Sequence, residues 1–151
     1  MQVRANGIAI EVDETGSPQG EPVLLIMGLG MQLIGWPEGF VAQLVARGYR
    51  VIRFDNRDVG LSQQFDAAGV PNLAAAAIRR AMGLALHAPY ALQDMADDAA
   101  GVLDALGIAS AHVCGASMGG MIAQHLAARH PRRVRSLTLM MTSRRARRGA
   151  G

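Results

Sequence analysis

The chain has 151 residues, of which 50 % are apolar and 18 % are charged, and its formal net charge is +3. These values are typical of one globular domain with a single core, and they exclude an intrinsically disordered chain. The single cysteine, Cys114, excludes an internal disulfide framework and a multi-cysteine zinc site. No apolar stretch reaches membrane-spanning length and residues 1–7 lack the apolar core of a secretory signal, so we expect a cytoplasmic protein without a membrane partner.

The first third of the chain predicts strands. Two short β-prone runs, residues 2–5 and 8–13, flank Asn6-Gly7, which is a strong hairpin signal. The continuous apolar run over residues 23–27 is bounded by Pro and Gly and predicts a strand buried on both faces. A Gly-rich loop, residues 28–31, follows this strand where open α/β sheets place their ligands.

Apolar residues at helical spacing predict a helix over residues 36–47, with Gly48 as its C-cap. The next strand is expected over residues 50–54 and runs into a polar turn segment, residues 55–62. Residues 66–90 are Ala-rich and contain Pro, so we expect a short helix or a lid-like excursion there.

Residues 92–106 predict an amphipathic helix that ends at Gly107. The inward face is expected to carry Leu92, Met95, Ala99, Val102, Leu103 and Leu106, and the outward face Asp94, Asp97, Asp98 and Asp104. Three of these aspartates lie close together and raise the question of a metal site, but no His or Cys lies at ligand spacing. A solvated helix face is therefore favoured.

The remaining pattern is strand, helix and strand over residues 111–114, 118–129 and 134–141. Strands that alternate with helices on short loops indicate parallel βαβ units. We therefore expect an α/β fold with a doubly wound, mostly parallel sheet of about six strands, opened by the antiparallel hairpin. Residues 1–142 would form one domain, and residues 143–151 a basic, unstructured tail.

A G-x-S-x-G motif, Gly115-Ala116-Ser117-Met118-Gly119, falls between a predicted strand and a predicted helix. A sharp turn at this place exposes the serine hydroxyl, and the two glycines let the chain pack tightly around it. Met118 would open the helix, so its N–H has no intrahelical acceptor and points where an oxyanion would form. Ser117 is thus the candidate nucleophile and Met118 a candidate oxyanion donor; the alternative is a Gly-rich turn with a structural role only.

With Gly28-Leu29, residues 55–62 and the G-x-S-x-G motif in this order, the sequence resembles the amino-terminal part of α/β-hydrolases of the esterase and lipase type. It is most similar to small bacterial esterases that resemble anthracycline methylesterases, over nearly everything up to Thr142. The resemblance implies an α/β-hydrolase fold, a small-molecule carboxylic-ester substrate, no cofactor, and the N–H groups of Leu29 and Met118 as oxyanion donors. Met27 stands where the family often has His.

The segment 55–62 matches the family's Asp-x-Arg-Gly-x-Gly-x-Ser loop, with Asp58 where Gly is usual. The resemblance implies that this loop is chiefly structural. From the residues alone, Asp55, Arg57 and Asp58 are also better explained by loop formation and ion pairing than by acid–base chemistry.

The triad is where the sequence departs from the family. In this fold the acid and the His follow the nucleophile in chain order, but no Asp, Glu or His follows His130. His125 lies about 12 Å along the helix after Ser117, so neither of these two imidazoles can serve as the base. His112 lies at the start of the predicted strand 111–114, at the end far from Ser117. For His87, a solvent-exposed or hydrogen-bonded side chain is favoured over a role as the base in place of the triad His.

The sequence therefore predicts a nucleophile and oxyanion donors without a general base. The resemblance implies that the cap and the last strands, which carry the acid and the His, are missing, so we expect a truncated hydrolase that is nearly inactive by itself. The motifs leave open whether water, another acyl acceptor or peroxide takes the acyl group, and they leave the oligomeric state open.

Charge is divided unevenly along the chain. Residues 1–105 carry seven Arg and twelve acids, whereas residues 106–151 carry eight Arg and no acid. The basic part has no interleaved aromatics and no long basic helix, which argues against a nucleic-acid partner.

The Gly28-Leu29-Gly30 loop lacks the third Gly of a dinucleotide motif and the Lys of a P-loop, so no nucleotide cofactor is expected. Cys114 is assigned to packing, and Met118 and Met121 to the core or an acyl pocket.

Overall fold

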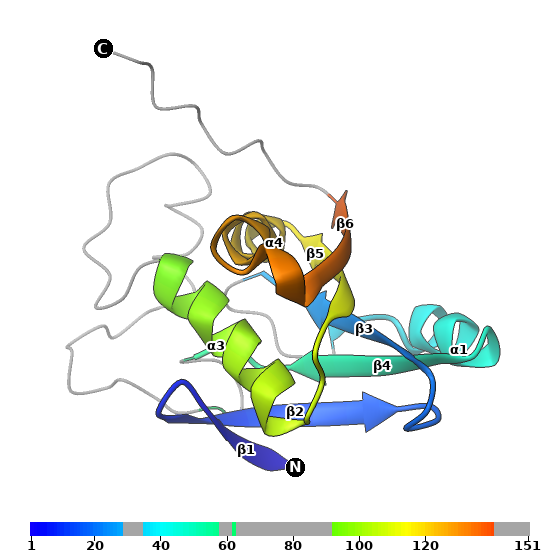
Figure 1. The fold of residues 1–151 in the computed structure, drawn as a ribbon. Helices are drawn as coiled ribbons and strands as arrows, with labels where there is room; N and C mark the ends of the chain where they lie inside the picture. The colour runs from blue at the N-terminus through cyan, green and yellow to red at the C-terminus, as the bar shows by residue number, and fades with distance from the viewer. Residues whose placement is uncertain (29–34, 58–61, 63–91, 141–151) are drawn as a thin grey trace.

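The computed structural model describes residues 1–28, 35–57, 62 and 92–140. Within these residues, one six-stranded sheet is flanked by three α-helices, and a 3-10 helix, Pro131–Arg133, precedes the last strand (Figure 1). The strands are β1 Gln2–Ala5, β2 Ile8–Thr15, β3 Glu21–Ile26, β4 Tyr49–Phe54, β5 Ala111–Ala116 and β6 Val134–Met140. The helices are α1 Glu38–Ala46, α3 Leu92–Ala105 and α4 Met118–Arg129.

The sheet has the strand order β1-β2-β4-β3-β5-β6. Strands β4, β3, β5 and β6 pair in parallel, whereas β1 pairs with β2 and β2 with β4 in antiparallel fashion. Asn6 and Gly7 both have positive φ, 51° and 78°, as a two-residue hairpin turn of type I′ requires. The expected mostly parallel sheet with an amino-terminal hairpin is confirmed.

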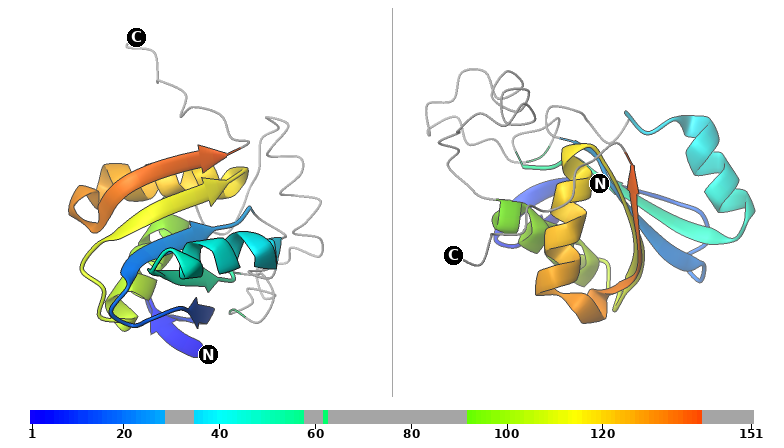
Figure 2. Two further views of the ribbon diagram at one scale, coloured as in Figure 1. Left: turned by 90° about the vertical axis from the view of Figure 1, so that its right-hand side faces the viewer. Right: turned by 90° about the horizontal axis from the view of Figure 1, so that it is seen from above.

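Helices cover both faces of this sheet, with α3 and α4 on one face and α1 on the other (Figure 2). The side chains of β3 alternate between the two cores: Leu24 and Ile26 pack under α3 and α4, and Leu25 packs under α1. All three are completely buried. The apolar run therefore forms the central, two-sided strand that its sequence predicts.

One prediction about helix α3 is wrong. Asp98, expected on the outward face, has a side chain that is only 1 % exposed. It accepts two hydrogen bonds from Arg57, at 2.7 and 2.8 Å, and one from Asn6 at 3.0 Å. Helical periodicity assigns an aspartate to water, but a guanidinium from the segment after β4 compensates the buried charge.

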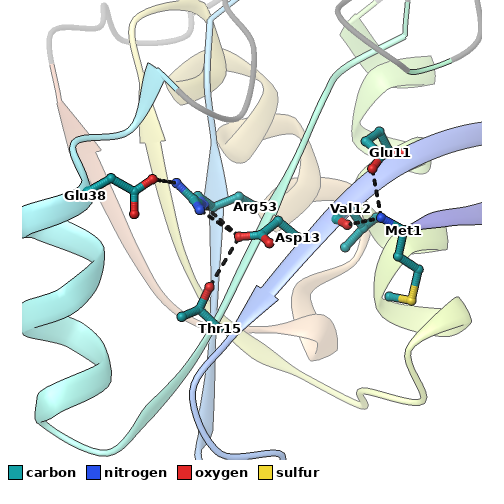
Figure 3. Close-up of polar contacts among 7 residues, drawn as sticks. All are labelled: Met1, Glu11, Val12, Asp13, Thr15, Glu38 and Arg53. Carbon is teal, nitrogen blue, oxygen red and sulfur yellow. Dashed lines mark hydrogen bonds and ion pairs between the residues drawn. The ribbon is translucent and has the colours of Figure 1, made fainter.

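A second buried charge lies where β2, β4 and α1 meet. Arg53 donates to Asp13, its direct partner across the β2–β4 pair, and to Glu38 at the start of α1 (Figure 3). Nearby, the amino group of Met1 donates to the Glu11 carboxylate and to the Val12 carbonyl. These contacts fix α1 and the chain start to the sheet.

The described helices include none that is both long and apolar enough to cross a membrane. The predicted excursion over residues 66–90, with His87, and the predicted tail over residues 143–151 lie outside the described residues.

Candidate active site

Ser117 occupies the turn between β5 and α4 and has φ 55° and ψ −125°. Among the described residues, only Asn6 shares a positive φ without being glycine. Such a backbone costs energy and is concentrated at functional sites. Ser117 is exposed while its neighbours Ala116 and Met118 are 4 % and 6 % exposed, so the turn lifts one hydroxyl out of a buried strand–helix junction.

The two glycines of the motif have a steric reason. A Cβ on Gly115 would lie 2.4 Å from the Gly119 carbonyl oxygen, and a Cβ on Gly119 would lie 2.1 Å from the Ile26 carbonyl oxygen. Both contacts are with backbone, which cannot move aside cheaply. Strands β3 and β5 and helix α4 therefore approach one another as closely as the turn demands.

The backbone around Ser117 is tied to its neighbours. The Ser117 N–H donates to the Met140 carbonyl at 2.8 Å, and the Gly120 N–H donates to the Ser117 carbonyl at 3.0 Å. Met118 is the first residue of α4, so its N–H has no intrahelical acceptor. These bonds hold the serine at the carboxyl edge of the parallel strands.

The end of β3 lies beside this turn. A Cβ built on Gly28 would be 3.5 Å from the Ser117 Cβ and 3.6 Å from the Met118 nitrogen. Leu29, the second expected oxyanion donor, is the next residue and lies outside the described residues. The structure thus brings Gly28, Ser117 and Met118 together.

Sequence reasoning missed Asn56. Its side-chain nitrogen donates to the Met27 carbonyl at 2.8 Å and so holds the end of β3, while its buried Oδ1 has no hydrogen-bond partner among the described residues. The only signal for it in the sequence was its place inside the matched loop 55–62.

The described part of that loop is structural, as expected. Ser62 Oγ donates to the Asp55 carbonyl and accepts from the Glu11 N–H at 2.9 Å. Arg57 pairs with Asp98. Asp58 lies outside the described residues.

The described histidines are engaged at other places. His112 is hydrogen-bonded to Glu21 at 2.9 Å and to Ser136 at 2.7 Å, at the end of β5 opposite Ser117. His130 lies beyond the far end of α4 and is bonded to Asp97 at 2.8 Å. His125 lies in the second half of α4, about 12 Å along the helix from Ser117. The structure brings none of these imidazoles to the serine.

The remaining candidates have packing roles. Cys114 is buried, and burial raises the pKa of its thiol, which opposes thiolate chemistry. Met118 belongs to the core under α3 and α4, and Met121 packs against it. The described residues contain no group of three His, Cys, Asp or Glu side chains that could hold a metal ion.

A family model described as the alpha/beta hydrolase fold matches residues 21–149. The chain belongs to the α/β-hydrolase family. It is 40 % identical over 126 residues to rhodomycin D methylesterase DauP of Streptomyces sp. (strain C5), covering 83 % of this chain and 36 % of the relative. It is 36 % identical over 125 residues to the putative carbamate hydrolase RutD of Variovorax paradoxus (strain S110), covering 83 % of this chain and 39 % of the relative.

Among solved structures, this α/β-hydrolase is similar to the enol-lactonase from Burkholderia xenovorans LB400, with a TM-score of 0.74 and 29 % identity. The match covers 95 % of this chain and 47 % of that one. The chain thus spans less than half the length of each of these three relatives. The family resemblance and the fold class that the sequence predicts are confirmed.

Proposed function

We propose that this α/β-hydrolase cleaves carboxylic esters with Ser117 as nucleophile and with the N–H groups of Met118 and Leu29 as its oxyanion hole. The observation that carries the proposal is the backbone of Ser117: an exposed serine held at φ 55° between a buried strand and a helix start. The methylesterases among its relatives support the ester as substrate class.

In this reaction Ser117 Oγ attacks the ester carbonyl carbon, and the carbonyl π electrons move onto oxygen. The two backbone N–H groups stabilise that oxyanion. Collapse of the tetrahedral intermediate breaks the carbon–oxygen bond to the alcohol, which leaves with a proton, and an acyl-Ser117 ester remains. Water then attacks the acyl carbon and releases the acid. No cofactor takes part.

The proton on Ser117 Oγ needs an acceptor, and no Asp, Glu or His follows His130 in this sequence. We therefore assign the triad acid and base to polypeptide outside residues 1–151. An α/β-hydrolase site without its triad retains roughly 10³–10⁴-fold catalysis over water from the oxyanion hole and binding alone. The second candidate function follows from the same fact: by themselves the 151 residues form a folded but catalytically inactive part of such an enzyme.

The test is labelling with a fluorophosphonate, with and without added imidazole as a free base. We expect slow labelling of the wild-type chain that imidazole accelerates, and no such labelling of Ser117→Ala. Ser17→Ala is the matched control, because Ser17 is an exposed serine in the loop between β2 and β3.

Equal labelling of wild type and Ser117→Ala would contradict the proposal. So would a folded wild-type chain that stays unlabelled at every imidazole concentration. Circular dichroism of each variant establishes that the chain under test is folded.

A further inference from the structure

Asn56 places a buried amide just beyond the end of strand β4. The residue is only 2 % exposed, and its Nδ2 donates to the Met27 carbonyl at 2.8 Å. Backbone pairing between β3 and β4 extends to Leu25 and Arg53, and so stops before Met27 is reached. The Asn56 side chain therefore continues the contact between these two strands after their backbone pairing has ended.

The backbone that carries this amide is itself fixed on both sides. Before Asn56, the Asp55 N–H donates to the Glu11 carbonyl of β2 at 3.0 Å. After it, Arg57 donates to both carboxylate oxygens of Asp98, at 2.7 and 2.8 Å. The amide thus comes from a well-anchored segment, which is what a side chain needs in order to position a site.

The first turn of helix α4 also contacts the Met27 backbone. A Cβ on Gly119 would lie 2.1 Å from the Ile26 carbonyl oxygen and 2.8 Å from the Met27 carbonyl carbon. Two contacts therefore restrain the Met27 carbonyl group: a hydrogen bond to its oxygen and close packing on its carbon. Because a peptide unit is planar, they also set the orientation of the whole Met27–Gly28 peptide.

Gly28, which ends this peptide, lies beside the groups that act in the proposed reaction. A Cβ on Gly28 would be 3.5 Å from the Ser117 Cβ and 3.6 Å from the Met118 nitrogen. Leu29, the other proposed oxyanion donor, follows Gly28 in the chain. A rotation of the Met27–Gly28 peptide would therefore change how the two donors converge on one oxygen.

The second polar atom of the amide indicates that Asn56 does more than fill space. The described residues offer no donor to its buried Oδ1. A buried acceptor without a donor costs free energy, and an apolar side chain of the same shape would avoid that cost. The amide at this position is therefore best explained by the hydrogen bond that its Nδ2 donates.

We infer that Asn56 is a positioning residue of the oxyanion hole, an inference that rests on the proposed function. Its Nδ2 fixes the Met27–Gly28 peptide so that the donor after β3 and the Met118 N–H converge on the oxyanion. Asn56 acts through the Met27 carbonyl and not on the reacting atoms. Its loss should slow acylation of Ser117 and leave binding of the acyl donor nearly unchanged, because the oxyanion develops only in the transition state.

The experiment measures fluorophosphonate labelling of the full 151-residue chain, with imidazole present, over a range of probe concentrations. This separates the maximal rate constant from the half-saturating probe concentration. Asn56→Leu should lower the maximal rate constant by about ten- to a hundredfold. The half-saturating concentration should change by less than about threefold.

Leu103→Ala is the control for lost stability. Leu103 is completely buried in the second half of α3, the helix that leads to the end of β5 opposite Ser117. This variant creates a cavity and lowers stability without touching Met27. As long as it is folded, we expect it to be labelled at the wild-type rate.

Asn56→Asp is a nearly isosteric second variant, and it keeps the test decisive where Asn56→Leu does not fold. A neutral carboxyl donates to the Met27 carbonyl, whereas a carboxylate only accepts. Burial should raise the pKa of the introduced carboxyl. Labelling relative to wild type should therefore be restored at about pH 5.5 and reduced about tenfold at about pH 8.5. Asn56→Leu should show no such recovery.

Wild-type maximal rate constants in both Asn56 variants at the higher pH would overturn the inference. So would a loss in Asn56→Asp that is equal at the two pH values, because packing alone would then explain it.

A measurement on the unlabelled chain keeps this inference separate from the proposed function. The NMR signals of the Met27 carbonyl carbon and the Gly28 amide should shift in Asn56→Asp between the two pH values, relative to wild type. If these signals shift while wild-type Ser117 stays unlabelled, the proposed function is contradicted and the Asn56 contact stands. If wild-type Ser117 is labelled and the Asn56 variants match it, this inference alone is overturned.

Discussion

Asp97 and Asp98 are adjacent on helix α3 and have opposite environments. The Asp97 side chain is 27 % exposed and bonds to Arg129 and His130 near the surface. The Asp98 side chain is 1 % exposed and forms a bidentate pair with Arg57. One helix position thus separates a surface ion pair from a buried one.

Removing these two carboxylates should have very different effects on stability. Asp98→Ala leaves the Arg57 guanidinium buried without its counter-charge, and we expect a loss of about 3–5 kcal/mol in the free energy of unfolding. Asp97→Ala is the matched control and should cost no more than about 1 kcal/mol. Urea unfolding measures both. Similar losses for the two variants would show that the Arg57 pair is not the buried contact described above.

At the residue scale, the G-x-S-x-G spacing predicts the sharp turn that the structure has at Ser117, because such a turn is encoded locally. The environments of Asp98 and Asn56 are not predicted, because what defines them is a partner far along the chain: Arg57 for the first and the Met27 carbonyl for the second. Local spacing carries no information on such contacts.

The glycines of α1 and α3, Gly39 and Gly101, differ in what surrounds them. A Cβ on Gly101 of α3 would lie 2.7 Å from the Asn6 nitrogen and 3.1 Å from the Ala5 carbonyl carbon. A Cβ on Gly39 of α1 would meet nothing within 4 Å. Gly101 therefore marks the place where α3 packs directly on the backbone of the hairpin.

Alanine at these two positions should change stability in opposite directions. Gly39→Ala adds helix propensity and should stabilise the protein by up to about 1 kcal/mol. Gly101→Ala gains the same propensity but pushes α3 from the β1–β2 turn, so we expect a net loss of about 1–3 kcal/mol. Thermal unfolding of the two variants measures both changes in stability. Stabilisation by Gly101→Ala would contradict the close packing of α3 on the hairpin.

Elements with strong local signals were predicted well. The Asn6-Gly7 turn and the bounds of α4 agree with the sequence because turn chemistry and His130-Pro131 determine them locally. Strand β3 begins at Glu21, two residues earlier than its apolar run, because pairing with β4 continues past the hydrophobic stretch. The residues at which such strand pairing begins depend on the neighbouring strand, so the apolar run alone does not predict them.

For the molecule as a whole, acid should lower stability through the carboxylates that link its two oppositely charged parts. Hydrogen bonding from Arg129, with a further contribution from His130, lowers the pKa of the Asp97 carboxyl against the opposing effect of burial. A lowered folded-state pKa means that the stabilisation is complete above the unfolded-state pKa and is lost as the pH falls through the folded-state value.

We therefore expect the urea midpoint to fall as the pH drops below about 4, and to fall less in Asp97→Asn than in the wild-type chain. Both proteins are compared at pH 7 and at pH 3. An equal decrease in the two would show that Asp97 does not contribute to the acid sensitivity.

If Ser117 is the nucleophile, a short-chain acyl donor leaves its acyl group on Ser117, and locating that group tests the role of Ser117 most directly. The folded chain is treated briefly with p-nitrophenyl acetate and mapped by tandem mass spectrometry. Because the chain contains no lysine, few other sites compete for the acetyl group. We predict an acetyl ester on Ser117 that persists, because no described imidazole lies beside Ser117 to activate water for deacylation. Acetylation of exposed serines such as Ser17 and Ser136 to the same extent as Ser117 would contradict the claim.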